Sequence, residues 1–506
     1  MQIVQKWLAL ATATGAAFAL LSCAQPPRAA LVDRGIVIRD VNVVGTRDGS
    51  LLRGVTVVLD GGTIKSITTS PVLASGSAQS VDGAGRYLVP GFLDMHTHAA
   101  ETLTSSPSDF PVLLANGITG IREASGTPAL IAAVQRHNAA VPTGASIGPE
   151  VLMMPSIIYA GQAPTEEGAR QFVRQRLAEG ADFIKIAGGP PTAFLAVIDE
   201  ARKQGSHAAG HMSLAVSAAA TSNAGYRSME HLGAGMGWLL DCSSDEASIR
   251  AQALAARVPP PTQVINPRIG DGNAHAALYQ RIIDTYDSAK CAQLAQLFAR
   301  NCTWQAVTLI RLRTQAFGND AAFRNDPNLR FVDKARVALW RQIAGQFGSA
   351  VAPSAQTTLQ SFYGLQRSSV KLMQDNGVKI ITGSDLGGGW VVPGFSLHQE
   401  FGELRAAGLS PLQVLQAATL HGAEFAGKAA TMGSVEVGKL ADLVLLDANP
   451  LEDSKNLDRI AAVFMRGKHF SRSALDKMLE EVAAGYAAQP QRPVAALNDP
   501  SHPPHN

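Results

Sequence analysis

Hydrophobic and polar positions follow two different patterns along this chain, one at its two ends and one between them. From residue 36 to 88, short runs rich in β-branched residues alternate with Gly, Asp and Ser turns, and the same texture returns near the end of the chain. Such alternation is typical of half-buried antiparallel strands. The two stretches, 31–88 and 429–472, are therefore predicted to fold together as one small β-sandwich domain.

The middle of the chain, residues 89–428, alternates β-rich runs with helical stretches. Apolar positions at helical spacing mark residues 165–180 and 191–205, which fit between two of the predicted strands. This βα repetition predicts an α/β fold, a (β/α)₈ TIM barrel. The eight strands are expected near 92–98, 117–123, 150–158, 182–187, 207–212, 226–231, 302–310 and 378–385.

Three further segments complete the predicted layout. Residues 240–300 are broken by Pro and Gly and are longer than an ordinary connection, so we expect an insertion that covers the barrel mouth. Ser410, Pro411 and Gln413 have the spacing of a capping box and predict the start of a helix. A C-terminal helix and a mobile tail are expected over 473–506.

The first residues predict export. Lys6 precedes an apolar run from Trp7 to Leu21, which is too short and too rich in Ala and Thr for a membrane span, so residues 1–22 are interpreted as a signal peptide. The run ends in Leu-Leu-Ser-Cys23, which resembles the lipobox of bacterial lipoproteins. We expect a periplasmic or outer-membrane, lipid-anchored protein whose only membrane attachment is a lipid on Cys23. The alternative is a plain export signal with an incidental cysteine.

The composition of the chain limits the kinds of partner that we expect. Hydrophobic residues make up 46% and charged residues 17%, and 43 basic against 41 acidic residues leave a formal net charge of +2. Because the sequence has no basic run, we do not expect nucleic acid as a partner. We expect the substrate to be a small molecule or a short peptide, and the composition is compatible with a homo-oligomer. Besides Cys23 the chain has Cys242, Cys291 and Cys302, so one disulfide can form in an oxidising compartment. We favour Cys242 with Cys291, since both fall in the insertion.

One strand carries the strongest chemical signal. In residues 90–98, Pro-Gly-Phe-Leu-Asp-Met-His-Thr-His, the period of two puts His96 and His98 on the same side. Later predicted strands end in Lys185, His211, His231 and Asp385. Each of these alone is better explained as a core histidine, a salt-bridge lysine or a helix cap. Together they converge at the carboxyl ends of the strands, where barrel enzymes have their active sites, and predict a metal centre.

The motifs PGFLDMHTH, GITGIRE, GADFIKI, GHMS, SMEH, TGSD and GSVEVGKLADLVLLD occur in an order that resembles the amidohydrolase superfamily, in particular its imidazolonepropionase-like and Xaa-Pro dipeptidase-like members. The resemblance implies two divalent ions bridged by a carboxylated Lys185, with a shared hydroxide as nucleophile. It also implies that His96, His98 and Asp385 hold one ion, that His211 and His231 hold the other, and that Asp385 is the general base and acid. Zinc is the default ion for these donors, with manganese, cobalt or iron as substitutes.

The substrate is less readable. The leading hypothesis is a carboxypeptidase- or dipeptidase-like enzyme that cleaves an amide C–N bond in dipeptides or N-acyl amino acids. The alternatives are a hydrolase of cyclic amides or lactones and a non-catalytic binding lipoprotein. After the third strand this chain has Tyr-Ala-Gly-Gln where relatives often carry Gly-Gly-His, which leaves the substrate open. Candidate substrate-binding residues are Arg122, Tyr159, Gln162, Arg311 and Trp390, with the two arginines favoured for a substrate carboxylate.

Overall fold

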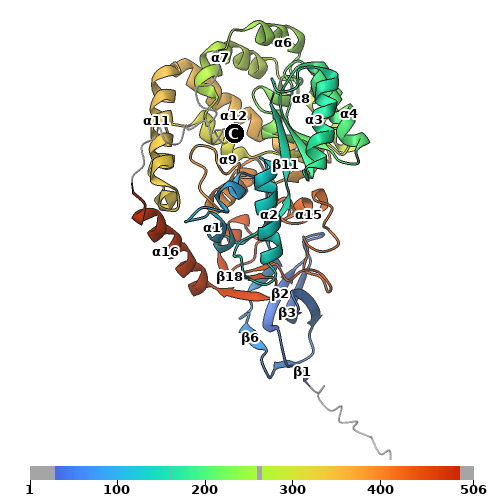
Figure 1. Cartoon of the computed structure of the whole chain (residues 1–506), viewed down its shortest axis with the longest axis vertical. Coiled ribbons are helices and arrows are strands. Elements are labelled where there is room, and N and C mark those ends of the chain that lie inside the picture. The colour runs from blue at the N-terminus through green and yellow to red at the C-terminus, as the bar shows by residue number, and fades with distance from the viewer. Residues whose placement is uncertain (1–28, 160, 259–264, 491–506) are drawn as a thin grey trace, which may run out of the picture.

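The computed structural model describes residues 29–159, 161–258 and 265–490. The predicted signal peptide, Cys23 and the tail beyond residue 490 lie outside this part of the chain. The fold is mixed α/β, as expected. Figure 1 shows a small β-rich lobe around β2, β3 and β6 at one end of the molecule and the helices α6 and α7 at the opposite end.

Both ends of the chain contribute strands to one eight-stranded sheet. Its order is β19-β18-β17-β7-β2-β3-β4, and β6 pairs alongside β2. Alternate residues of β2 and β3, such as Ile36, Ile38, Val57 and Leu59, are buried in one apolar cluster with Leu443 of β17. The strands are Ile36–Val44 (β2), Leu51–Asp60 (β3), Thr63–Thr68 (β4), Gln79–Asp82 (β6), Tyr87–Pro90 (β7), Leu443–Leu446 (β17), Ile460–Met465 (β18) and Lys468–Ser471 (β19). The short strands Ala30–Val32 (β1) and Val72–Ala74 (β5) form a separate parallel pair.

All eight strands predicted for the middle of the chain are present and parallel. They form a three-stranded sheet, β10-β9-β8, and a six-stranded sheet, β11-β12-β13-β14-β15-β16. The third predicted strand is split at Met154 into β10 and β11, and the others are mostly shorter than expected. The bounds are Phe92–Thr97 (β8), Ile118–Glu123 (β9), Glu150–Met153 (β10), Pro155–Tyr159 (β11), Phe183–Ala187 (β12), Ala208–His211 (β13), Ser228–Glu230 (β14), Trp304–Ala306 (β15) and Ile380–Ile381 (β16).

Backbone hydrogen bonds also connect the first of these strands to the segment that follows the last. The Met95 N–H donates to the Thr382 carbonyl at 2.9 Å, and the Asp385 N–H donates to the His96 carbonyl at 2.8 Å. Glycine at position 383 permits this approach, because a Cβ there would lie 2.7 Å from the Cβ of His96. The two segments that carry His96 and Asp385 are thus held directly against each other.

Helices alternate with the parallel strands along the chain. On α3 the expected apolar side packs inward, with Val173 buried and Phe172 and Leu177 against the core. The helices are Phe110–Ala115 (α1), Pro128–Ala140 (α2), Glu166–Ala178 (α3), Pro191–Lys203 (α4), Ala218–Asn223 (α5), Glu246–Ala255 (α6), Arg268–Asp284 (α7), Ser288–Arg300 (α8), Leu309–Ala316 (α9), Ala321–Arg324 (α10), Lys334–Ala350 (α11), Pro353–Asp375 (α12), Phe395–Ala406 (α13), Pro411–Ala418 (α14), Leu420–Phe425 (α15) and Arg472–Ala488 (α16).

Two local predictions are confirmed. The Ser410 hydroxyl accepts from the Gln413 N–H, the Gln413 side chain accepts from the Ser410 N–H, and α14 begins there with this capping box. Cys242 and Cys291 form a disulfide, while Cys302 is free and exposed. The predicted insertion is mostly helical, since α6, α7 and α8 occupy it. Within the described ranges, none of the helices is both long and apolar enough to cross a membrane.

Candidate metal centre

Three of the predicted ligands form a compact buried group. The Nε2 atom of His96 lies 3.2 Å from Oδ1 of Asp385, and Nε2 of His98 lies 3.5 Å from the same oxygen. One donor atom from each of the three residues lies within 4.8 Å of the others, a spacing that suits a shared metal ion. The strand period brings the two imidazoles together, and the pairing of β8 with the segment after β16 adds the carboxylate.

The other three predicted ligands converge on the same place. Lys185, on β12, has its Nζ 3.3 Å from Nε2 of His96. The ring of His231, directly after β14, lies 4.6 Å from that of His96 and 5.2 Å from that of His211, at the end of β13. All six residues proposed from the sequence are therefore neighbours in space.

Unusual backbone conformations occur at the same residues. His231 and Asp385 have positive φ angles of 54° and 57°, and Thr308, which contacts His231, has a φ of 43°. These values lie in the left-handed region, which non-glycine residues adopt at a cost of about 1–3 kcal/mol and which is concentrated at functional sites. The fold therefore accepts backbone strain at the residues that build this cluster.

Polar neighbours fix the orientation of two imidazoles. The Nδ1 atom of His96 donates to Oε2 of Glu230 at 2.6 Å, and Arg122 donates to the same oxygen at 2.7 Å. Nδ1 of His231 shares a hydrogen bond of 2.5 Å with the hydroxyl of Thr308. With Nδ1 engaged, Nε2 of each ring is the nitrogen that faces the cluster. Carboxylate and hydroxyl partners of this kind commonly orient metal-binding histidines.

His98 is the exception, and it supplies the clearest indication of a missing partner. Its side chain is buried, yet neither ring nitrogen has a hydrogen-bond partner among the residues that the structure describes. The nearest carboxylate to Nδ1 is Oε1 of Glu123, at 3.9 Å. A buried polar atom without a partner is costly and calls for an explanation such as an ion. The donor set fits a metal at this point.

Burial controls the charge of the cluster. It lowers the pKa of His98 to about 4 and, together with the positive charge of Lys185, lowers the pKa of His211 to about 3. Burial also lowers the pKa of Lys185. At Asp385 burial opposes ionisation, but His231 and His96 hold the pKa of this carboxyl well below its ordinary value. At neutral pH the His98 and His211 imidazoles are neutral and the Asp385 carboxyl is charged, the protonation states in which these groups bind metals.

A cavity of about 340 Å³ opens directly onto the cluster and is the natural place for a substrate. Tyr159 and Arg311, both predicted to bind substrate, line it. Arg311 is nevertheless already engaged: its Nε donates to Oδ2 of Asp385 at 3.0 Å, and its side chain also donates to the Ile265 carbonyl at 2.6 Å. Its role in the structure is to hold Asp385.

The other three candidate substrate-binding residues lie outside the lining of this cavity. Arg122 is almost completely buried and donates to Met95, Ser228 and Glu230, so no part of its guanidinium is left for a substrate carboxylate. The Gln162 side chain is exposed and accepts from the backbone N–H of Tyr159. Trp390 is buried against Trp340 and donates to the Gly318 carbonyl. These three side chains stabilise the fold around the site and lie outside the cavity wall.

Several residues at the site were missed by sequence reasoning. Glu230 immediately precedes His231, and its position in SMEH was a usable signal for a carboxylate beside the cluster. Arg268 and Asp271, on α7 of the insertion, line the cavity and form an ion pair of 2.8 Å. Their approach from a segment of irregular sequence had no local signal.

Comparison with known proteins agrees with this geometry. A sequence model of the Amidohydrolase family matches residues 332–469. Adenine deaminase from Listeria monocytogenes serotype 4b (strain F2365) is 27% identical over 188 residues, which cover 35% of this chain. The matched part spans only 31% of that relative.

Solved structures resemble the chain over most of its length. Bottromycin amidohydrolase matches with a TM-score of 0.65 and 20% identity, covering 90% of this chain and 92% of its own. A Xaa-Pro dipeptidase with methionine bound in its active site matches with a TM-score of 0.60 and 16% identity. The match covers 86% of this chain and 99% of the dipeptidase chain. At these identities the likeness concerns the fold. The chain is thus similar to amidohydrolases in one matched segment, residues 332–469, and in its fold.

Proposed function

We propose that this protein is a metal-dependent hydrolase that cleaves an amide C–N bond, most consistent with a carboxypeptidase- or dipeptidase-like enzyme for dipeptides or N-acyl amino acids. The observation that carries the proposal is the buried cluster of His96, His98 and Asp385 beside Lys185. Neither ring nitrogen of His98 has a hydrogen-bond partner among the described residues. Structural likeness to a Xaa-Pro dipeptidase supports the peptidase-like choice.

The scaffold proposed for this chemistry is one (β/α)₈ barrel that contains both parallel sheets. The chain passes from β10 to β11 with Met154 alone between them. At the other junction, hydrogen bonds join Met95 to Thr382 and His98 to Leu386, both at 2.9 Å. A closed arrangement explains why the candidate ligands, carried by strands far apart in sequence, gather at one point.

The donors divide into two sets. His96, His98 and Asp385 would hold one divalent ion and His211 and His231 a second, with a carboxylated Lys185 as the common ligand. Zinc is the default ion for nitrogen and oxygen donors of this kind. When bound, such ions polarise a substrate carbonyl and lower the pKa of a coordinated water.

The protein's own residues supply positioning and proton transfer. Oδ1 of Asp385 faces His96 and His98, while Oδ2 accepts from Arg311, which fixes the plane of the carboxylate. From this position Asp385 would take a proton from the attacking water as the C–O bond forms and return it to the leaving nitrogen as the C–N bond breaks. His211 and Tyr159 on the cavity wall would help to exclude bulk water.

Hydrolysis of a cyclic amide or a lactone is the alternative. Similarity to adenine deaminase, which covers 35% of this chain, keeps a ring substrate in consideration. Export to the periplasm or outer membrane stays a prediction and favours peptides or N-acyl amino acids as the substrates within reach.

A hydrolysis screen tests the proposal. Purified protein loaded with zinc in bicarbonate buffer should release amino acids from dipeptides or N-acyl amino acids, and Lys185→Arg should abolish both this activity and the binding of two ions per chain, measured by elemental analysis. Lys428→Arg, a half-exposed lysine on the surface, is the matched control. Hydrolysis of cyclic amides or lactones alone would replace the peptidase assignment. No hydrolysis of any of these substrates, together with no bound metal, would overturn the proposal.

A further inference from the structure

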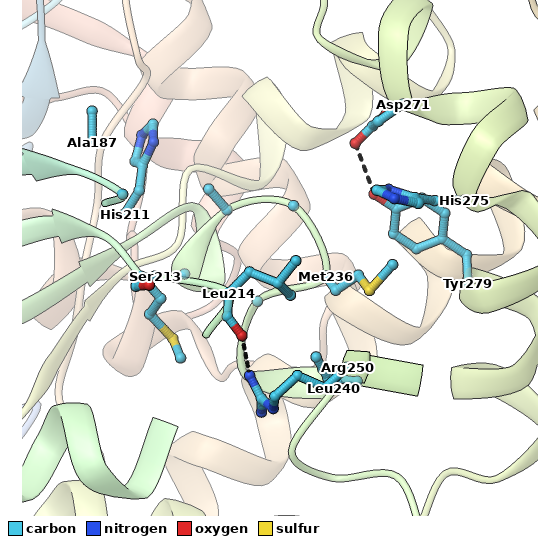
Figure 2. A pocket seen from close by; sticks show the side chains of 16 residues that line it. Ala187, His211, Ser213, Leu214, Met236, Leu240, Arg250, Asp271, His275 and Tyr279 are labelled. Atoms are coloured by element: carbon cyan, nitrogen blue, oxygen red, sulfur yellow. Dashed lines mark hydrogen bonds between the residues drawn. The ribbon is translucent and has the colours of Figure 1, made fainter. Parts of the chain in front are cut away.

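A second cavity adjoins the one at the metal centre. It has a volume of about 280 Å³ and lies between α7 of the insertion and the segments that follow β13 and β14 (Figure 2). The two cavities adjoin each other, because the same five residues line both. These are Ala187, His211, Ala234, Gly235 and Asp271.

Most of the second cavity is apolar. Leu214, Met236 and Leu240 line it, and Figure 2 shows the Leu214 side chain reaching into the space beside Met236. The positions next to His211 and α7 are small residues, including Gly235, where a Cβ would meet no atom within 4 Å. Room for a side-chain-sized group therefore exists beside the metal cluster without any movement of the backbone.

The charged groups on this wall are paired with each other. Arg250 donates to Oδ2 of Asp241 at 3.0 Å and to Oε1 of Glu246 at 2.9 Å. Arg268, which lines the first cavity, donates to Oδ2 of Asp271 at 2.8 Å. A charged ligand group would lose its hydration on entering, and the charged side chains it meets, Arg250 and Asp271, each already have an ion-pair partner.

Helix α7 adds a polar edge to the cavity. The hydroxyl of Tyr279 donates to Oδ2 of Asp271 at 3.0 Å. Two other buried atoms, Oδ1 of Asp271 and Nε2 of His275, have no hydrogen-bond partner within the described part of the chain. Figure 2 shows Asp271, His275 and Tyr279 gathered on one side of the cavity. Buried polar atoms of this kind are ready to pair with a neutral donor group.

We propose that the second cavity is a specificity subsite that takes an uncharged, mainly apolar side chain of the substrate while the scissile amide lies at the metal centre. The proposal rests on the proposed function and deepens it. Preferred substrates then carry an aliphatic or aromatic side chain on one side of the amide, and a neutral donor such as a phenol hydroxyl or an amide at its tip meets the edge formed by α7. Burial of apolar area supplies the affinity, and the paired charges supply the discrimination.

The first test varies the substrate. In dipeptides and N-acyl amino acids changed at one side chain at a time, kcat/KM should rise at least about tenfold from Gly to Leu or Phe on one side of the amide. It should fall by a similar factor from Leu to Lys or Glu. Leu214→Trp, which fills the cavity, should remove the preference for Leu and Phe over Gly. Leu254→Trp is the matched control, since Leu254 is exposed on α6 of the same insertion.

The second test measures binding without turnover. Calorimetry on the zinc-loaded protein should show binding of neutral benzamide and at least about tenfold weaker binding of cationic benzamidine. Leu214→Trp should abolish benzamide binding, whereas Leu214→Asp should reverse the order of the two probes by adding an unpaired carboxylate.

The two proposals fail separately. Binding of benzamide that depends on Leu214, together with no hydrolysis of any substrate, would retain the subsite and reject the hydrolase. Hydrolysis that is equally fast for Gly, Leu and Lys side chains and is unchanged in Leu214→Trp would retain the hydrolase and reject the subsite. Equal binding of benzamide by Leu214→Trp and the unmodified protein would also reject the subsite.

Discussion

Arg311 and Asp385 form a buried ion pair in which Nε of the arginine donates to Oδ2 of the carboxylate at 3.0 Å. The pair connects the start of α9 with the segment after β16. Because Asp385 also faces His96 and His98, the arginine determines which oxygen remains directed at the candidate metal centre.

Replacement of Arg311 by Met should therefore release the carboxylate. We expect kcat to fall at least about tenfold and the free energy of unfolding to fall by about 3–5 kcal/mol, because a buried charge loses its partner. Steady-state kinetics and urea unfolding measure the two effects. Arg313→Met on the same helix, where the arginine is partly exposed and pairs with Glu403, should leave kcat unchanged. Equal kinetics for the two variants would remove Arg311 from this positioning role.

Asp385→Asn tests the proton-transfer role itself. The amide is nearly isosteric but cannot accept the proton, so kcat should fall by about 10² to 10⁴-fold while the circular dichroism spectrum stays that of the folded protein. Asp375→Asn, at an exposed position at the end of α12, serves as the control. Turnover close to that of the control would show that another group carries the proton.

Glu230→Gln tests the orientation of His96. The neutral amide weakens the hydrogen bond from Nδ1 of His96 and leaves Arg122 without its acidic partner. Metal affinity should fall by about 10 to 100-fold, as expected when the group that orients a ligand histidine is lost. Competition with a chromogenic chelator measures the affinity, and Glu436→Gln provides an exposed control. Unchanged affinity would mean that His96 is oriented by the strand alone.

The disulfide should contribute to stability rather than to chemistry. Cys242 and Cys291 are separated by 49 positions, and loop-closure entropy for a loop of that length predicts a loss of about 4 kcal/mol in the Cys242→Ser and Cys291→Ser double variant. Thermal unfolding of the oxidised and reduced protein provides the measurement. Cys302→Ser should unfold at the same temperature as the unmodified protein, and a similar loss in that variant would point to a role for the free thiol.

Short-range patterns in the sequence predicted much of this architecture. The alternation at 92–98 located His96 on β8 and His98 directly after it, and Ser410 with Gln413 located the start of α14. Such signals are local, because a period of two or a capping pair depends only on residues that are close in the sequence. The structure that they predict therefore does not depend on contacts with distant segments. The six candidate ligands were found for the same reason, since each lies on a recognisable strand or a few residues after it.

The parts that could not be predicted depend on contacts between distant segments. Nothing near Arg122 in the sequence indicates that its guanidinium is consumed by Met95, Ser228 and Glu230, so it looked free for a substrate. Trp390 likewise follows the Asp385 segment but turns into the packing around Trp340. The approach of α7 to the cavity was equally unreadable, because it depends on how the whole insertion packs.

The pairing of β8 with the segment beyond β16 has a consequence for the order of events during synthesis. Oδ2 of Asp94 accepts from the hydroxyl of Ser384, a contact that spans 290 positions of the chain. His96 and His98 are therefore synthesised long before Asp385, the carboxylate that lies beside them in the folded protein. A nascent chain that ends before Ser384 and Asp385 lacks this contact, so the candidate site is completed only late in synthesis.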